Sequence, residues 1–343
     1  MREPTIYDVA KKAGVSPSTV SRALHGKDRV SDHTRDKIFE ASEQLGFTAS
    51  KEASRLRSGK TGRIALIVGN RMSGWYSSEL AEGVYSALSN DGYDLLFYRV
   101  ADQKQRTDFF SSMPIKRNTD AVIISSFAPT ENEGRSLRDV GVPIVGVNTM
   151  HLNDRYSMAS IGVDEVSTLR DLVYRLSVMG HKRIAFIQTT PINEDFVWDA
   201  DQRIEGYRQG LRAAGITHRE DYEIPVPHSQ EAGSVAVSAI LALDPQPTAV
   251  CCISDEVAIS LVHELRRYGV RVPNDISVVG FDDREMAASL GISTIRHRPD
   301  EYGKTAGEMA VKLARGEELD QPRLIAPTSL ILRETIGPAH QVH

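Results

Sequence analysis

From Arg63 onward, short apolar runs alternate with amphipathic stretches of helix length, and this alternation restricts the possible folds more than any other feature of the sequence. The runs are rich in valine and isoleucine, as expected of parallel strands that are buried on both faces. They occupy Ile64–Val68, Leu95–Tyr98, Ala121–Ile124, Ile144–Val147, Ile184–Ile187, Ala249–Ile253 and Ile276–Phe281. Helices are expected near residues 77–89, 166–179, 201–214, 232–241, 256–268 and 303–314. The pattern predicts an α/β body, residues 61–338, that is long enough for two doubly wound, parallel-sheet lobes.

Polar residues follow several of the predicted strands. In open parallel sheets, ligands bind beyond the carboxyl ends of the strands, so these positions are candidate ligand contacts. They hold Asn70, Ser125, Asn148, Ser254-Asp255 and Asp282-Asp283. Carboxylates, amides and hydroxyls of this kind suit the recognition of a polyol.

The body shows no motif of a known enzyme class. It has no dinucleotide-binding glycine pattern, no phosphate-binding loop and no nucleophile elbow, and its histidines lack metal-ligand spacing. Asp282 and Asp283 are neighbours at a strand end and should point apart, which disfavours hydrolysis by paired carboxylates. We therefore expect a binding protein without catalytic activity, cofactor or metal.

The first 60 residues differ in charge from the rest of the chain. They carry twelve Lys and Arg against eight Asp and Glu, whereas the whole chain has a net charge of -5. A basic end on an acidic body suits a protein that presents one end to a polyanion, although charged surfaces are often merely solvated.

Three short helices are predicted in this basic end. The first helix is expected to start at Thr5 with Asp8 and to end at Gly14. The second starts at Ser16 with Pro17 and ends at Gly26, and the third starts at Ser31 and ends at Gly46. Apolar residues at helical spacing give the helices their buried sides, namely Ile6, Val9, Ala10 and Ala13, then Val20, Ala23 and Leu24, then Ile38, Ala41 and Leu45. Two short helices separated by Gly14-Val15 are typical of a helix-turn-helix, whose second helix enters the major groove. Periodicity alone equally allows a small helical cap with a solvated Ser/Thr face.

The run from Thr5 to Gly26, TIYDVAKKAGVSPSTVSRALHG, resembles the headpiece signature of the lactose-repressor (LacI/GalR) family. The resemblance continues through Val30-Ser31, Thr34-Arg35 and Leu45-Gly46-Phe47. It implies an all-α helix-turn-helix headpiece, residues 1–48, that binds DNA. The DNA-binding residues expected in the headpiece are Thr5, Tyr7, Ser16, Pro17, Ser18, Thr19, Ser21, Arg22, His25 and Ser31. The resemblance places Ser16, Ser18, Ser21 and Arg22 on the recognition helix and Tyr7 and Ser31 against backbone phosphates, while His25 replaces a common asparagine.

Residues 49–60 are predicted to form a hinge segment. Small and charged residues without a sustained apolar face make it a poor helix in isolation, so a flexible tether is the simplest interpretation. The family resemblance instead implies a hinge helix that forms on DNA, with Leu56 entering the minor groove. The chain has Ala49-Ser50 where the family usually has Pro-Asn, which leaves the entry to this helix less constrained.

The body also resembles the effector domain of the family, in Gly141–Val145, Met179–Ile187, Arg203–Tyr207, Pro247–Val250 and Arg271–Asp283. This implies two lobes of periplasmic-binding-protein type, residues 61–160 plus 292–320 and residues 161–291 plus 321–338. The effector contacts implied by matching positions are Arg203, Ser254 and Asp282, with Ser125, Asn148 and His297 as secondary matches. Ser254 replaces a common asparagine. Trp75 and Tyr76, in a Gly/Ser-rich loop after the first strand, are expected to supply an aromatic platform; for Phe196 and Trp198, core or surface packing is an equal alternative.

Three functional classes fit the body: a transcription regulator, a periplasmic-type solute-binding protein and a sugar enzyme. The headpiece, and the lack of an N-terminal apolar signal, favour a cytoplasmic, sequence-specific DNA-binding regulator. We expect a repressor whose operator affinity is controlled by a small molecule such as a sugar; a regulator with a purine corepressor is the alternative.

The sequence also bears on assembly. Because helix-turn-helix proteins read half-sites in pairs, we expect a homodimer on a pseudo-palindromic operator. The sequence has no C-terminal heptad run, so a coiled-coil tetramer is not expected. It has no long apolar stretch, so a membrane partner is not expected either. The adjacent Cys251 and Cys252 are predicted to be core thiols.

Overall fold

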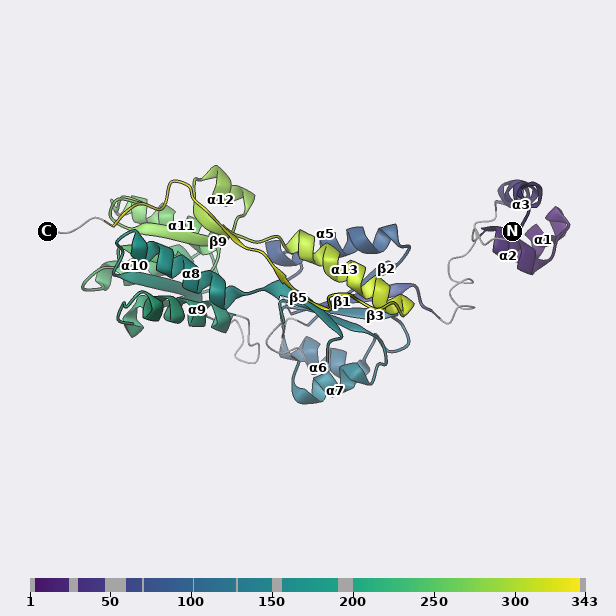
Figure 1. Cartoon of the computed structure of the whole chain (residues 1–343), viewed down its shortest axis with the longest axis horizontal. Helices are drawn as coiled ribbons and strands as arrows, with labels where there is room; N and C mark the ends of the chain where they lie inside the picture. The colour runs from purple at the N-terminus through teal and green to yellow at the C-terminus, as the bar shows by residue number, and fades with distance from the viewer. Residues whose placement is uncertain are drawn as a thin grey trace. The chain divides into compact units, whose positions relative to one another are not determined.

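The structure is a computed structural model, and it describes residues 4–24, 30–46, 60–69, 71–100, 102–127, 129–149, 156–190 and 200–339. The chain divides into two units, Met1–Thr61 and Gly62–His343 (Figure 1). In the described part of the chain, no helix combines the length and the apolar character needed to cross a membrane.

The first unit contains the three predicted helices, α1 (Ile6–Ala13), α2 (Pro17–Leu24) and α3 (Asp32–Leu45). The Asp8 carboxylate accepts hydrogen bonds from the Thr5 backbone N–H and hydroxyl, which caps α1. Gly14 and Gly46 end α1 and α3 in the left-handed conformation, which glycine adopts without strain. The core of the unit consists of Val9, Ala10, Val20, Ala23, Ile38 and Ala41. The predicted all-α headpiece is therefore confirmed.

The first lobe of the body is a six-stranded sheet in the order β11-β5-β4-β3-β1-β2, and all its described pairings are parallel. Its strands are β1 (Arg63–Val68), β2 (Asp94–Arg99), β3 (Ala121–Ser125), β4 (Ile144–Val147), β5 (Ala159–Val163) and β11 (Arg323–Ala326). Helices α5 (Trp75–Asn90) and α13 (Pro299–Arg315) cover one face, and α6 (Gln103–Ser112) and α7 (Glu131–Arg138) the other (Figure 1). Alternate residues of β1 face the two sides, with Ile64 and Leu66 against α5 and α13 and Ala65 and Ile67 against α6 and α7.

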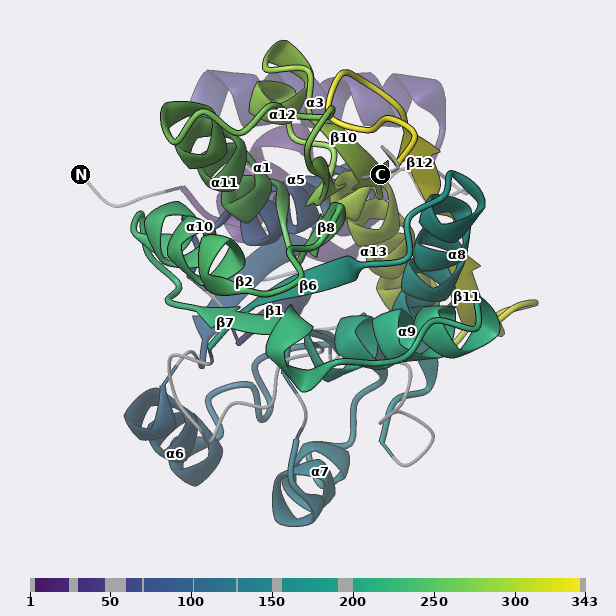
Figure 2. The same cartoon turned by 90° about the vertical axis from the view of Figure 1, so that its left-hand side faces the viewer.

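The second lobe has the sheet order β12-β10-β9-β8-β6-β7, in which only the β10–β12 pairing is antiparallel among those described. Its strands are β6 (Ile184–Thr189), β7 (Glu223–Val226), β8 (Ala249–Cys252), β9 (Ser277–Asp282), β10 (Ser293–Arg296) and β12 (Ser329–Ile331). Its helices are α8 (Glu165–Val178), α9 (Ala200–Ala213), the 3-10 turn η1 (Glu220–Tyr222), α10 (Ala232–Ala242), α11 (Asp255–Arg267) and α12 (Glu285–Ser289). Helices α8 and α9 lie on one side of the sheet and α10 and α11 on the other (Figure 2). The two sheets confirm the predicted doubly wound α/β body.

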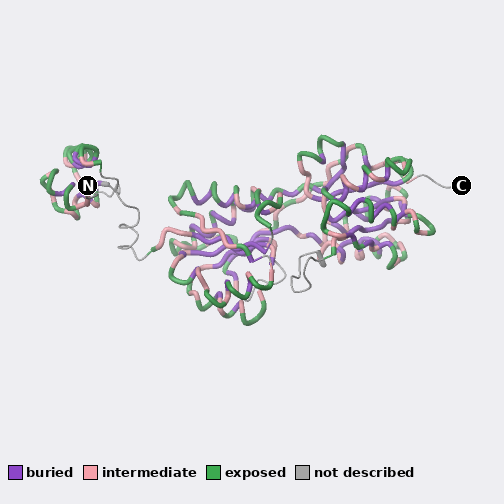
Figure 3. Tube along the Cα trace, turned by 180° about the vertical axis from the view of Figure 1, so that it is seen from behind, coloured by how far each residue is buried: buried purple, intermediate pink, exposed green. Residues whose placement is uncertain are grey.

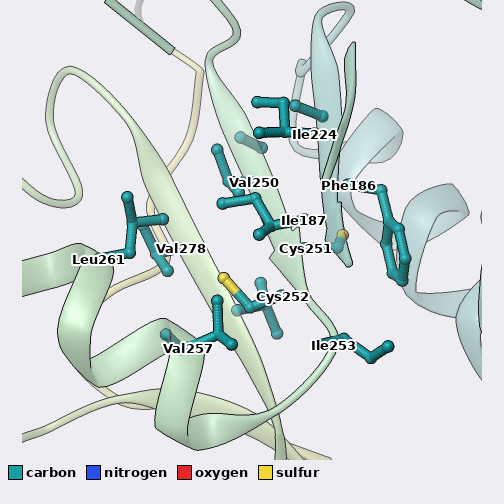
Figure 4. Packing of buried hydrophobic residues seen from close by; sticks show 14 of the residues in the cluster. Phe186, Ile187, Ile224, Val250, Cys251, Cys252, Ile253, Val257, Leu261 and Val278 are labelled. Carbon is teal, nitrogen blue, oxygen red and sulfur yellow. The ribbon is translucent and has the colours of Figure 1, made fainter. Parts of the chain in front are cut away.

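The sheets form the buried centre of each lobe, and the outer faces of the helices are exposed (Figure 3). In the second lobe, Cys251 and Cys252 point to opposite faces of β8, toward Phe186 and Val257 respectively (Figure 4). Both thiols are free and buried, as predicted, and burial raises the pKa of Cys251 to about 12.

The chain passes between the lobes three times, after β5, after β10 and after β11. The predicted lobe boundaries differ from the sheets at these crossings. Strand β10, assigned from sequence to the first lobe, pairs with β9 of the second; β11, assigned to the second lobe, pairs with β5 of the first, which itself runs to Val163. Both β10 and β11 are four-residue strands, too short to give an alternation signal, so the sequence offered no marker for the sheet to which each belongs.

Helices α5 and α13 approach each other closely at two glycines. A Cβ added to Gly83 would lie 2.0 Å from the Asp300 carbonyl oxygen, and one added to Gly303 would lie 2.4 Å from the Leu80 carbonyl oxygen. Neither contact is possible without separating the helices. Glycine is therefore required at both positions by packing rather than by backbone conformation.

Gly83→Ala is accordingly expected to destabilise the body by about 1–3 kcal/mol, as overpacking of a tight interface does. The matched control is Gly134→Ala in α7, where a Cβ would meet the Tyr156 ring at 3.4 Å, an ordinary contact. The control should be neutral or stabilising by up to about 1 kcal/mol, because alanine favours helix over glycine. Urea denaturation of the full chain followed by circular dichroism measures both, and equal stability of the two variants would contradict the packing described here.

Candidate functional site

Helix α2 of the headpiece begins with a cluster of hydroxyl groups. The backbone N–H of Thr19 donates to Ser16 Oγ at 3.2 Å, so Ser16 caps the helix as predicted. The Ser16 hydroxyl also lies 2.8 Å from those of Ser18 and Thr19. Pro17 occupies the first helical position, where its missing N–H costs no hydrogen bond.

The side of α2 opposite its buried Val20 and Ala23 carries the predicted recognition residues. Ser18 and Arg22 are exposed there, and the Arg22 Nε donates to the Ser18 carbonyl at 3.3 Å. Of the other predicted contacts, Tyr7 on α1 is 71% exposed, Ser31 is exposed at the start of α3, and Thr5 and Ser21 are half-buried. His25 and Leu56 lie outside the described residues. An exposed guanidinium beside hydroxyl groups can contact base edges and phosphates.

The body contains a cavity of about 430 Å³ at the carboxyl ends of its parallel strands. Residues from both lobes line it, including Tyr76 and Asn148 from the first and Arg203 and Ser254 from the second. This is where the strand-end rule for open sheets places a ligand.

Five of the eight predicted effector contacts line this cavity, namely Tyr76, Asn148, Arg203, Ser254 and Asp282. The other three, Trp75, Ser125 and His297, do not. Ser125 and His297 are almost fully buried, at 0% and 3% exposed, and the Trp75 ring packs edge-on against His297. Ser126, the next residue along the chain, lines the cavity instead of Ser125.

Arg203 forms a buried ion pair with Glu165. Its NH2 group donates to Glu165 Oε1 at 2.7 Å, NH1 donates to the Ile253 carbonyl at 2.5 Å, and the guanidinium lies 3.7 Å from the centre of the Phe281 ring. Burial alone would lower the pKa of Arg203, but the neighbouring Glu165 carboxylate raises it, so the guanidinium stays charged.

On the opposite wall, a hydrogen-bonded chain fixes Asn148 and Tyr76. The Asn148 amide accepts from the Val163 N–H and donates to the Tyr76 hydroxyl, each at 3.0 Å. The Tyr76 hydroxyl lies 3.3 Å from Ser125 Oγ, so the buried Ser125 contributes to the orientation of Tyr76. These hydrogen bonds fix the orientation of the Asn148 and Tyr76 side chains in the wall.

Asp282 is connected to the first lobe through His297. Nε2 of His297 lies 2.9 Å from Asp282 Oδ1, and Nδ1 contacts the Tyr302 hydroxyl on α13. Since an ionised carboxylate only accepts hydrogen bonds, Nε2 donates to Asp282. His297 thus connects a residue of the cavity to a helix of the other lobe.

The neighbouring carboxylates Asp255 and Asp283 point away from the cavity. Asp283 binds Arg296 and Arg333, each at 2.5 Å, which outweighs its burial and lowers its pKa. Asp255 is fully buried beneath Ser254; burial raises its pKa to about 7, against the opposing hydrogen bond from Thr294. Asp282 and Asp283 do point apart, as their adjacency predicted.

Three cavity residues other than glycine have positive φ angles: Ser126 (62°), Asn148 (51°) and Asp282 (128°). Such conformations cost of order 1–3 kcal/mol each and concentrate at binding and catalytic sites. Their position at three different strand ends agrees with a ligand-binding role for this cavity.

Comparison with known proteins identifies both units. Residues 5–50 match the model of bacterial regulatory proteins of the lacI family, and residues 173–336 match that of a periplasmic binding protein-like domain. The Bacillus subtilis (strain 168) protein described as probable HTH-type transcriptional repressor ExuR is 30% identical over 338 residues, which cover 97% of this chain and 98% of the relative. The chain belongs to the LacI family of bacterial regulatory proteins.

Two solved structures of this family are similar over nearly the whole chain. That of the transcriptional regulator CelR in complex with cellobiose is 27% identical, covers 97% of this chain and 99% of its own, and has a TM-score of 0.70. The Lac repressor dimer bound to operator has the same fold, with a TM-score of 0.81, 23% identity and coverage of 97% and 99%. As a LacI-family member, the protein is a DNA-binding transcription regulator.

The sequence did not reveal every residue of the cavity in this LacI-family regulator. Glu165 was missed because β5, the strand that precedes it, has the mixed sequence ASIGV and was not predicted. Thr189, the last residue of β6, and Thr190, which follows it, lie two and three residues beyond the predicted apolar run. The segment Pro227–Gln230 follows β7, another strand without a recognisable signal.

Proposed function

We propose that the protein is a repressor that binds a pseudo-palindromic operator as a homodimer and that a sugar in the cavity controls its operator affinity. The observation that supports the sugar most directly is the cavity itself, whose lining combines carboxylates, an amide, a guanidinium and hydroxyl groups at strand ends. The related CelR structure contains cellobiose, a carbohydrate. The homodimer is proposed because a helix-turn-helix reads half-sites in pairs.

Within this proposal, Tyr76, Asn148, Arg203, Ser254 and Asp282 contact the sugar. Trp75, Ser125 and His297 support these contacts from behind the cavity wall. The protein is proposed to bind the sugar without converting it, because the carboxylates of Glu165 and Asp282 are already engaged by Arg203 and His297. Its site of action is proposed to be the cytoplasm, where operator DNA is accessible.

A purine corepressor is the alternative effector. A flat base is usually held between aromatic rings, as stacking requires. Among the described lining residues, Tyr76 is the one Phe, Tyr or Trp side chain, and its hydroxyl is fixed by Asn148. This lining favours hydroxyl groups over a stacked base.

The proposed function is tested with the full chain in two steps. Selection from a random DNA library defines the operator, and we expect two half-sites in inverted repeat. Titration of that operator complex with panels of sugars and of purines then identifies the effector, with a sugar expected to change operator affinity by at least about fivefold, as allosteric coupling commonly does. A response to purines alone would contradict the proposed effector, and selection of no DNA sequence would contradict the operator.

For the headpiece, Arg22 is proposed to read a guanine edge. Arg22→Ala should reduce specific operator binding by about 1–3 kcal/mol and barely change binding to random DNA, because a bidentate base contact is lost. The matched control, Lys37→Ala, removes the same charge from an exposed position on α3 and should weaken binding to both DNAs equally. Fluorescence anisotropy at fixed salt measures all four affinities. Equal loss of both affinities in Arg22→Ala would rule out base readout.

A further inference from the structure

The wall of the cavity contains a buried carboxylate oxygen without a hydrogen-bond partner in the described part of the chain. The Glu165 side chain is 9% exposed; its Oε1 accepts from Arg203, whereas its Oε2 has no partner among the residues that the structure describes. A buried charged acceptor left unsatisfied is costly, and in native proteins such groups usually receive a donor from water or a ligand. Because Glu165 lines the cavity, a ligand can bring that donor.

The same residue neutralises the positive charge of the cavity. Arg203 would ordinarily attract an anionic group, since guanidinium binds carboxylate and phosphate in a bidentate manner. Here the guanidinium donates to Glu165 and to the Ile253 carbonyl, and its face is covered by Phe281. An incoming anion would have to compete with a carboxylate that is already bound.

The remaining charged groups around the cavity are mostly negative. Asp282 and Glu256 also line it, so among the described lining residues three carboxylates stand against one guanidinium, together with the exposed His228. Glu256 pairs with Arg284 at 3.4 Å, but its side chain is 70% exposed, so solvent screens it. Glu165 and Asp282 are the shielded charges, at 9% and 15% exposed, and therefore dominate the field inside.

We propose that the cavity selects a hydroxyl-rich effector without an anionic group, and that Glu165 is the residue that sets this selectivity by pairing with Arg203 and by accepting a ligand donor on Oε2. Neutral sugars and amino sugars satisfy this chemistry. Sugar phosphates and uronic acids do not, because they would bring negative charge into a cavity whose guanidinium among the described lining residues, that of Arg203, is already paired with Glu165. The inference rests on the proposed ligand-binding function of the cavity.

The test uses the full chain and matched sets of ligands. Each set contains a neutral sugar, its 6-phosphate, its uronic acid and its amino derivative, and sets are prepared for several hexoses and disaccharides. Calorimetry should show at least one neutral or amino sugar binding about tenfold or more tightly than its anionic counterparts, which is about 1.4 kcal/mol. Tighter binding of the phosphate or uronate would overturn the selectivity while leaving the proposed function intact. Absence of binding by every sugar, charged or neutral, would overturn both.

The variant Glu165→Gln separates the role of this residue from the repulsion of anionic sugars by the other carboxylates of the cavity. The amide can still accept from Arg203, but the guanidinium loses its counter-charge, so affinity for the anionic sugars should rise. The ratio of the affinities for neutral and anionic sugars should therefore fall by about tenfold. Glu256→Gln is the matched control: it removes the same charge from a screened position and should change the preference less than about threefold. A gain of anion binding is not an effect that mere structural damage produces.

An equal change in the two variants, or none in Glu165→Gln, would show that Glu165 does not set the selectivity. If Glu165→Gln does not fold, Glu165→Asp provides a second test. The shorter carboxylate keeps the charge but withdraws Oε2 from the ligand, so neutral sugars should bind about tenfold more weakly while anionic sugars stay excluded. Undiminished binding of neutral sugars by Glu165→Asp would overturn the proposed contact.

Discussion

Arg203→Ala is expected to lower the free energy of unfolding of the body by about 3–5 kcal/mol, because it removes one partner of a buried ion pair and leaves the other charge without compensation. The side chains of Arg203 and Glu165 are 16% and 9% exposed, and their atoms approach to 2.7 Å. The variant also loses the contact of the guanidinium with the Phe281 ring. Urea denaturation of the full chain measures the change.

Two companion variants make the result interpretable. Arg212→Ala, on the same helix, breaks a 2.9 Å pair with Glu205 whose side chains are 63% and 42% exposed, and should cost no more than about 1 kcal/mol. The double replacement Arg203→Met and Glu165→Met removes both buried charges and should recover most of the lost stability, since an apolar pair of similar volume is often as stable as an ion pair. Similar small losses in Arg203→Ala and Arg212→Ala would show that the Arg203–Glu165 pair is not buried as described.

Because of this structural role, Arg203 is a poor residue with which to test ligand binding in the cavity. From the sequence, Arg203 is simply a candidate ligand contact at a family-matched position. In the structure, its guanidinium is also a structural cation that compensates Glu165. Loss of effector binding in Arg203→Ala would therefore combine a lost contact with a destabilised lobe, and Asp282 is the better residue for testing the cavity.

Sequence periodicity was sufficient for the strongly apolar elements. The headpiece helices and seven body strands were predicted because each has several apolar residues at helical or strand spacing, as in Ile64–Val68. Strand β5 was missed because Ser160 and Gly162 interrupt its apolar pattern. Gly162 is required there because a Cβ would lie 2.9 Å from Asn148 Oδ1, so the weak strand signal is itself a consequence of packing at the cavity.

The candidate site was predicted only in part for a related reason. The strand-end rule identifies the edge of each sheet at which the cavity lies, and it selected Asn148, Ser254 and Asp282, which line the cavity. The rule does not say which of two adjacent side chains faces the ligand. Ser125 ends its strand inside the core, whereas Ser126, which has a φ of 62°, lines the cavity. That reversal depends on backbone conformation, which composition does not encode.

Asp282→Asn is expected to raise the effector concentration at which operator binding responds by about tenfold or more, while ligand-free operator affinity stays within about twofold of the original. An effector alters DNA affinity only through its different affinities for two conformations of the protein, so loss of its binding removes the response without altering the headpiece. Asp282 Oδ1 accepts a hydrogen bond from His297, and the side-chain carbonyl of asparagine can replace that acceptor. Asparagine, like aspartate, also tolerates the positive φ of this position. What the variant loses is the charge that strengthens hydrogen bonds from sugar hydroxyls, which should weaken effector binding by about tenfold or more.

The adjacent Asp283 provides the control for this substitution. Its carboxylate binds Arg296 and Arg333 and does not line the cavity, so Asp283→Asn should reduce stability but retain normal effector affinity. Calorimetry with the effector and operator titrations with and without it separate the two variants. Normal effector binding by Asp282→Asn would mean that the sugar does not occupy this cavity as proposed. Collapse of ligand-free operator binding would instead show that the Asp282–His297–Tyr302 connection between the lobes maintains the DNA-binding state, and Asp282 would then be a structural residue.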